Sequence, residues 1–167
     1  SLSDRNLKVP TVFRTIEWLD NNKVRLVDQT KLPLEVEHIV TDSHERIAES
    51  IKVMEIRGAP AIGAAAAMGM ALAAIESDAK EKAELIDFLE GAAETLNTRP
   101  TAHNLIWATT RMLRIAEETR GSVQEITERL IEEAKEVAEE DVRMCRRIGE
   151  NALSLIEPGY TIQTICN

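Results

Sequence analysis

The stretch GAPAIGAAAAMGMALAAI, residues 58–75, decides the fold of this 167-residue chain. Pro60 suits the first turn of a helix, where its missing N–H is not needed. From Pro60 to Ile75 the residues are small and apolar on every face, so the segment predicts a helix that is buried all round. A helix of this kind needs other elements packed around it, and the flanking sequence supplies them.

Three amphipathic helices are expected after the buried one, because apolar residues recur at three- and four-residue spacing. The apolar positions of the first are Leu85, Phe88, Leu89, Ala92 and Leu96. The second runs from about Thr101 to Glu118, and the positions expected to face inward are Leu105, Ile106, Thr109, Met112 and Leu113.

The third of these helices opens with a capping box, Ser122-Val-Gln-Glu125. Its apolar stripe comprises Ile126, Leu130, Ala134, Val137, Cys145, Ile148, Ala152 and Leu155. The place of Cys145 on this stripe predicts that its thiol lies in the core. Asp141, on the same stripe, is either a partly exposed acid near the domain edge or a buried carboxylate that orders a neighbouring loop. The acidic run from Glu132 to Asp141 is interpreted as a solvated helix face.

The sequence before the buried helix predicts a small antiparallel sheet. Strands are expected over Val12–Trp18, Lys23–Val27 and Leu34–Val40, because these runs are β-branched or alternate polar and apolar residues. Asp20-Asn21-Asn22 forms a turn cluster between the first two strands.

A further helix is expected between this sheet and the buried helix. Asp42 or Ser43 is suited to cap it. Its apolar positions are Ile47, Ile51 and Met54, and it ends at Arg57-Gly58.

The predicted fold class is therefore α+β: a small antiparallel β subdomain over 1–41, followed by a helical bundle over 42–157. After the turn at Pro158-Gly159, the segment Tyr160–Cys166 has the pattern of a strand. This strand is either an edge addition to the first sheet or the opening strand of a Rossmann-like α/β domain that is absent here. The turn followed by a strand favours the second interpretation, which sets 158–167 apart as a third part.

Composition narrows the function classes. The chain is 44% hydrophobic and 29% charged, which excludes disorder as a default. Its formal net charge of −9, with no basic stripe, argues against nucleic-acid or anionic-membrane partners. Residues 58–75 are expected to be too weakly apolar for a membrane span. Two cysteines make no disulfide framework, so a cytoplasmic setting is expected, and the three histidines lack metal-ligand spacing, which argues against a zinc site.

The first candidate site is the segment Arg57-Gly58-Ala59-Pro60-Ala61-Ile62-Gly63. An arginine stands at the end of one helix, and glycine lets the backbone approach a ligand closely. The next helix then offers unpaired N–H groups and a positive dipole end. These features suit an anion such as phosphate. The alternative is a helix–helix corner with a solvated arginine.

Two further candidates follow. Arg99 lies in another tight connection before a helix start, where Thr98 or Thr101 could cap the helix and the guanidinium could grip a phosphate bidentately. Cys166 lies at the C-terminal end of the expected last strand, a usual place for ligands of open α/β sheets. It is either a thiolate nucleophile or proton carrier, or a small buried hydrophobe.

Taken together, these segments resemble the methylthioribose-1-phosphate isomerases. Residues 15–18 and 24–33, TIEW and VRLVDQTKLP, resemble the family's opening. Residues 57–63 match R-G-A-P-A-I-G, and residues 98–105, with Trp107-Ala108 after them, match T-R-P-T-A-x-N-L. Glu140-Asp141 and residues 147–150 resemble the end of the family's long helix. The final Thr164-Ile165-Cys166-Asn167 resembles T-H-C-N, with Ile165 where the family has histidine.

The resemblance implies an aldose–ketose isomerase of methionine salvage, acting on a sugar phosphate without metal or nucleotide. Arg57, the Gly58 and Ala59 backbone, and Arg99 would hold the phosphate. Cys166 would take part in hydrogen transfer from C2 to C1, as a proton or a hydride. The family's general-acid aspartate lies in a C-terminal Rossmann-like domain that this chain does not contain, so this chain alone is expected to turn over little.

Three functional hypotheses remain at this stage. The first is an isomerase in full-length form, for methylthioribose 1-phosphate or for ribose 1,5-bisphosphate. The second is a non-catalytic relative of the initiation factor two-B regulatory subunits, and the third is a helical interaction module. The retained cysteine and arginines favour an enzyme. The expected partners are a sugar phosphate, the C-terminal domain of the same protein and a second copy in a homodimer.

Overall fold

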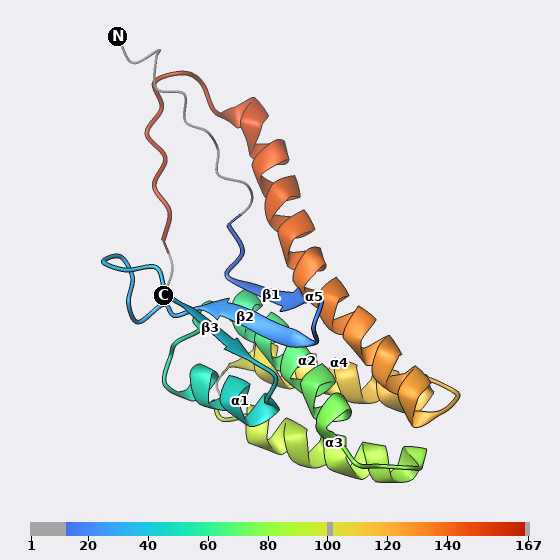
Figure 1. Cartoon of the computed structure of the whole chain (residues 1–167). Helices are drawn as coiled ribbons and strands as arrows, with labels where there is room; N and C mark the ends of the chain where they lie inside the picture. Colours follow the sequence, from blue (N-terminus) through green and yellow to red (C-terminus); the bar gives the residue numbers. More distant parts are fainter. Residues whose placement is uncertain (1–12, 100–101, 166–167) are drawn as a thin grey trace.

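The computed structural model describes residues 13–99 and 102–165, and Figure 1 shows their arrangement. These residues form three strands, five α-helices and one short 3-10 helix, in the order strands first and helices after. The strands are β1 (Ile16–Leu19), β2 (Lys23–Val27) and β3 (His38–Thr41). The helices are α1 (His44–Lys52), α2 (Ala59–Glu76), α3 (Lys82–Leu96), α4 (His103–Glu118), α5 (Val123–Ala152) and η2 (Leu153–Leu155). The predicted α+β class, a small sheet before a helical bundle, is confirmed.

The three strands form an antiparallel sheet in the order β1-β2-β3. Val24 and Leu26 of β2 are buried against the bundle while Arg25 between them faces solvent, as the two-residue period of a strand requires. The third strand is shorter than the predicted Leu34–Val40. Leu34 is 90% exposed and its N–H bonds back to the Lys31 carbonyl at 3.1 Å, so this part of the chain is a turn and not a strand.

Helix α2 occupies the centre of the bundle and contacts α1, α3, α4 and α5. Every residue from Ile62 to Ala74 is buried, which confirms the prediction made from its composition. Small residues are what allow the neighbours to approach. A Cβ added at Gly69 would lie 2.7 Å from Cδ2 of Leu96 in α3, closer than such atoms are found in proteins.

By length and composition, α2 is apolar enough to cross a membrane, contrary to the expectation that this stretch is too weakly apolar. However, 72% of the apolar window is buried within the protein. Four helices and the sheet already cover this surface, so α2 is the core helix of the bundle.

Helix α5 is long, and only its first half belongs to the core. Ile126, Leu130, Ala134 and Val137 are buried, but Ile148 is 63% exposed and Cys145 is exposed. The prediction that Cys145 lies in the core is therefore wrong. Figure 1 shows the physical reason: the outer half of α5 projects beyond the other helices, where no described element covers its apolar stripe.

Two smaller expectations also differ from the structure. Ile106 was expected to face inward and is 45% exposed, because the buried face of α4 runs through Leu105, Ala108 and Met112 instead. Residues 160–165 form no strand and are exposed. A strand requires a hydrogen-bonded neighbour, and none of the described residues provides one.

Candidate anion-binding site

The five helices of the described chain differ in how their N-termini are satisfied. The Ser43 hydroxyl accepts a hydrogen bond from Arg46 N at the start of α1, at 3.3 Å. The Ser122 hydroxyl does the same for Glu125 N at the start of α5, at 3.2 Å. At the start of α3, the Glu84 carboxylate accepts from backbone N–H groups at 2.8 and 3.3 Å. These three ends therefore have side-chain acceptors of their own.

Helices α2 and α4 lack this feature. Their N-cap residues are Gly58 and Ala102, and no described side chain accepts a hydrogen bond from either first turn. The first N–H groups of a helix have no partner within the helix, and they carry the positive end of its dipole. The two helices that follow the arginine motifs are thus the two whose N-termini remain available to an external anion. Thr98 does not cap α4, and Thr101 lies outside the described residues.

The first turn of α4 packs against α2 about one turn from the start of α2. A Cβ added at Gly63 of α2 would lie 3.5 Å from both the Cβ and the carbonyl oxygen of Asn104, the second residue of α4. The junctions that carry Arg57 and Arg99 therefore lie at the same end of the bundle. The structure brings together two helix dipoles and two arginine-bearing loops that are far apart in the sequence.

The Arg57–Gly58 junction is open to solvent. Arg57, Gly58 and Ala59 are all exposed, and a Cβ added at Gly58 would meet nothing within 4 Å. Gly58 has φ +91°, a conformation that other L-residues rarely adopt. This glycine turns the chain directly from Arg57 into α2.

Arg99 is half-buried, and its carbonyl accepts a hydrogen bond from Ala102 N at 2.9 Å. This bond joins the two described residues on either side of the connection before α4. Pro100 and Thr101 lie outside the described residues. Cys166 also lies outside them, so its predicted catalytic role stays a prediction.

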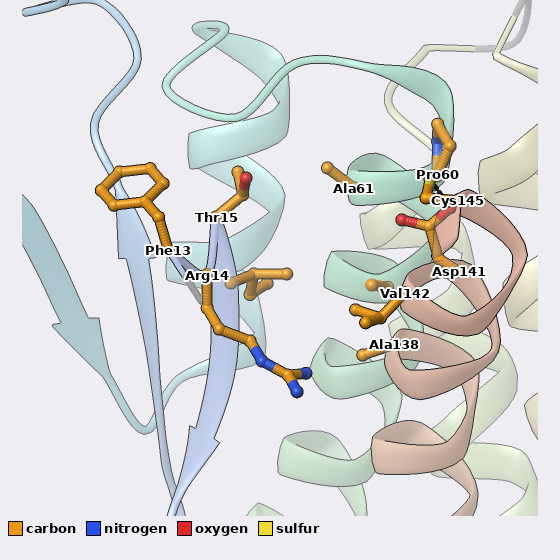
Figure 2. Close-up of a pocket in the computed structure, with 11 residues that line it drawn as sticks. Phe13, Arg14, Thr15, Pro60, Ala61, Ala138, Asp141, Val142 and Cys145 are labelled. Atoms are coloured by element: carbon orange, nitrogen blue, oxygen red, sulfur yellow. Dashed lines mark hydrogen bonds between the residues drawn. The ribbon is translucent and has the colours of Figure 1, made fainter. Parts of the chain in front are cut away.

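A cavity of about 230 Å³ lies beside the start of α2. Figure 2 shows that it lies between the chain at Phe13 to Thr15, the first turn of α2 at Pro60 and Ala61, and α5. Its walls are mostly apolar. Asp141 of α5 lines it and is half-buried, as its interpretation as a partly exposed acid at the domain edge predicts. The Cys145 thiol lies 3.8 Å from the Asp141 carboxylate in the same wall.

Sequence reasoning missed a hydrogen-bond network that holds Glu55, two residues before Arg57. The Arg46 guanidinium binds the Glu55 carboxylate at 2.7 and 3.2 Å, and the Ser50 hydroxyl donates to the same carboxylate at 2.7 Å. The hydrogen bond from Arg46 is the main cause that holds the pKa of Glu55 below its usual value. The sequence pattern before Arg57 did not predict this network, because Glu55 lies in the loop after α1 and folds back onto the helix that carries Arg46 and Ser50.

Among the described residues, no group of three or more His, Cys, Asp or Glu side chains is arranged to hold a metal ion. The candidate site therefore consists of backbone N–H groups, two helix dipoles and two arginines. An arrangement of this kind binds and orients an anion.

The fold and the site together define an α+β domain in which two neighbouring helix N-termini, at one end of a helical bundle, have no described side-chain cap. The chain belongs to the Initiation factor 2 subunit family, which matches residues 55–167. This confirms the wider family to which the sequence motifs point.

Similar proteins carry a more specific name. The chain is 45% identical over 161 residues to a methylthioribose-1-phosphate isomerase of Crocosphaera subtropica, covering 94% of this chain and 46% of that protein. It is 48% identical over 157 residues to one of Geotalea uraniireducens, covering 93% and 45%. The chain thus spans about half the length of the curated relatives it matches.

Two solved structures share the fold. The 5-methylthioribose 1-phosphate isomerase of Pyrococcus horikoshii is 44% identical with a TM-score of 0.73, covering 79% of this chain and 37% of that chain. The translation initiation factor eIF-2B subunit delta of A. fulgidus is 43% identical with a TM-score of 0.81, covering 89% and 43%. The two neighbours carry different names at nearly equal identity.

Proposed function

We propose that this chain is the N-terminal part of an isomerase that converts S-methyl-5-thioribose 1-phosphate to S-methyl-5-thioribulose 1-phosphate in methionine salvage, in the cytoplasm. The observation that carries the proposal is the pair of adjacent helix N-termini without described side-chain caps, each preceded by an arginine. The similar proteins named methylthioribose-1-phosphate isomerase support the choice of substrate.

In this proposal, the anion end of the bundle holds the substrate phosphate. Arg57 and Arg99 supply positive charge, and the backbone at Gly58 and Ala59 supplies N–H donors. A fixed phosphate orients the sugar ring for the chemistry at C1 and C2. The phosphate also blocks the anomeric oxygen, so the ring opens only when a proton donor assists. That donor is the aspartate that the resemblance assigns to the C-terminal domain, and Cys166 carries out the hydrogen transfer.

The cavity beside α2 favours a methylthio substrate over ribose 1,5-bisphosphate. Its walls at Phe13, Pro60 and Ala61 suit an uncharged methylthio group. A second phosphate in this cavity would be repelled by the Asp141 carboxylate, and the lining cation Arg14 is already paired with Glu139. The cavity therefore supports methylthioribose 1-phosphate as the better-fitting substrate.

The outer half of α5 is the proposed docking surface for the C-terminal domain. Met144 and Ile148 are exposed on it, and Leu153 in η2 continues the apolar surface. Contiguous apolar surface of this kind is typical of a site where another element docks. Because the relatives are about twice as long as this chain, the remainder of the same polypeptide is the proposed cover. A homodimer of the complete protein is proposed as well.

A non-catalytic regulatory role is the second candidate. The A. fulgidus structure favours it, since that protein is named as an initiation factor subunit and covers 89% of this chain. The retained Arg57, Arg99 and Cys166 favour the enzyme.

The direct test is turnover of methylthioribose 1-phosphate by the full-length protein, followed by NMR of the sugar carbons. Cys166→Ser is expected to reduce turnover by about 10²–10⁴-fold, the range for loss of a positioned proton-transfer group. The control is Thr127→Ser, a conservative change near the start of α5 and outside the cavity lining, which is expected to leave turnover within about twofold. An inactive unsubstituted protein would favour the regulatory role, and an active Cys166→Ser variant would remove Cys166 from the mechanism.

A further inference from the structure

The peptide between Arg57 and Gly58 is held from one side by a loop of the sheet. Gln29 follows β2 and donates a side-chain hydrogen bond from Nε2 to the Arg57 carbonyl, at 3.2 Å. Its own backbone N–H donates to the Glu55 carbonyl at 2.8 Å. Gln29 thus donates hydrogen bonds to two carbonyls, those of Glu55 and Arg57.

Holding the Arg57 carbonyl also determines where the next N–H points. The C=O of Arg57 and the N–H of Gly58 belong to one rigid planar peptide unit, and in the trans form they point in opposite directions. With the carbonyl turned toward Gln29, the Gly58 N–H is turned away from it. Among the described residues, no acceptor for this N–H is found.

The space in front of the junction is open. A Cβ added at Gly58 would have no neighbour within 4 Å, and Gly58 itself is exposed. The N–H therefore points away from Gln29 at the place where the uncapped end of α2 begins. An anion bound there would meet the Gly58 N–H together with the helix N-terminus.

Both partners of this contact are themselves fixed. Next to Gln29, the buried Asp28 carboxylate accepts hydrogen bonds from the N–H and the hydroxyl of Thr30, at 2.9 and 2.6 Å. On the other side, Arg46 and Ser50 hold the Glu55 carboxylate. The contact thus joins two turns of chain that have hydrogen bonds of their own.

We propose that Gln29 is a positioning residue for the anion site: it holds the Arg57 carbonyl so that the Gly58 N–H faces the bound phosphate. The inference rests on the proposed function, because it requires an anion at the start of α2. Gln29 does not touch the substrate. It acts through the orientation of a single peptide unit, in which the carbonyl dipole is kept away from the phosphate.

The test uses the ¹⁵N-labelled chain titrated with inorganic phosphate, with the Gly58 amide signal followed by NMR. Gln29→Met keeps the length of the side chain and removes the donor. It is expected to weaken phosphate binding about fivefold, the equivalent of one hydrogen bond, and to shift the Gly58 signal before phosphate is added. Gln124→Met is the matched control, because the Gln124 side chain is exposed at the start of α5 and donates to Glu128 of the same helix, at 3.0 Å.

The Gly58 signal separates positioning from general stability. A purely structural role would lower the melting temperature of Gln29→Met and leave both the affinity and the phosphate-saturated Gly58 signal unchanged. That result would overturn the inference. If Gln29→Met does not fold, Gln29→Glu has the same shape without the donor, and an unchanged Gly58 signal in its phosphate-free spectrum would overturn the inference equally.

Arg57→Ala distinguishes a failure of the anion site from a failure of the proposed role of Gln29. Phosphate binding that Arg57→Ala weakens and Gln29→Met leaves intact contradicts the role of Gln29 alone. Absence of phosphate binding by the unsubstituted chain contradicts the anion site, and the role of Gln29 falls with it.

Discussion

At the scale of single residues, a cluster of four charged side chains lies where α4 packs against α5. Arg111 donates to Glu133 at 2.7 Å and holds both carboxylate oxygens of Glu140 at 2.7 Å, with its guanidinium 5.3 Å from the centre of the Trp107 ring. Arg129 also donates to Glu133, at 2.6 Å. Glu133 is only 5% exposed, so the acidic run is not entirely the solvated face that its sequence suggests.

Removing Arg111 is expected to destabilise the chain through Glu133. In Arg111→Ala the buried carboxylate keeps only Arg129, and the free energy of unfolding should fall by about 2 kcal/mol, less than the roughly 3–5 kcal/mol of a fully orphaned buried charge. Arg114→Ala is the control on the same helix. Its nearest acid, Glu118, is 3.8 Å away on the surface, so it should change stability by less than about 0.5 kcal/mol. Equal effects in urea unfolding would contradict this reading of the cluster.

The same cluster predicts a dependence on pH. Burial raises the pKa of Glu133, but the hydrogen bonds from Arg111 and Arg129 outweigh it and leave the pKa below its usual value. The hydrogen bonds from Arg111 likewise lower the pKa of Glu140. Carboxylates with a lowered folded pKa stabilise the protein above their unfolded value of about 4.3, and this stabilisation is lost as pH falls through the folded pKa. The penalty of Arg111→Ala should therefore be smaller at pH 3 than at pH 7 in urea unfolding. A penalty independent of pH would contradict the ionic role.

At the scale of elements, two glycines with free space around them distinguish the effect of backbone strain from that of helix propensity. Gly58 has φ +91° and Gly91 lies within α3, and a Cβ at either position would meet nothing within 4 Å. Gly58→Ala should destabilise the chain by about 1–3 kcal/mol because alanine resists a positive φ with extended ψ. Gly91→Ala should stabilise it by about 0.5–1 kcal/mol because alanine favours helix. Thermal unfolding measures both, and the same sign for the two variants would contradict the account.

Most elements could be predicted because their signals are local. The capping box at Ser122 fixes the start of α5, and the small apolar run fixes α2 as the centre of the bundle. The start of β3 could not be predicted from alternation alone, because the turn that exposes Leu34 is closed by a hydrogen bond to Lys31. The two arginine junctions of the candidate site were likewise visible as motifs, whereas the adjacency of Gly63 and Asn104 depends on how whole helices pack.

At the scale of the whole molecule, the core ends partway along α5. The apolar stripe continues through Cys145 and Ile148, and periodicity alone cannot show where the covering elements stop. This is why sequence reasoning placed Cys145 in the core. The contact between Gln29 and Arg57 could not be predicted either, because a hydrogen bond between two loops produces no periodic pattern in the sequence.

The two halves of α5 should respond differently to the loss of apolar side chains. Leu130→Ala removes a fully buried side chain and should cost about 2–5 kcal/mol. Ile148→Ala, in the exposed half, should change the free energy of unfolding by less than about 0.5 kcal/mol. Urea unfolding of this chain measures both. A cost above about 1 kcal/mol for Ile148→Ala would indicate that the outer half is covered in solution.

The central claim is that the adjacent starts of α2 and α4 bind a phosphate despite the net charge of −9. Calorimetric titration of the chain with inorganic phosphate tests it most directly. Arg57→Ala should weaken binding about tenfold, the worth of a charge-assisted hydrogen bond. Arg120→Ala changes the net charge equally in the exposed connection after α4, at the far end of the bundle, and should leave binding within about twofold after screening by salt. Equal affinities for Arg57→Ala and the unsubstituted chain, or no binding at all, would contradict the account.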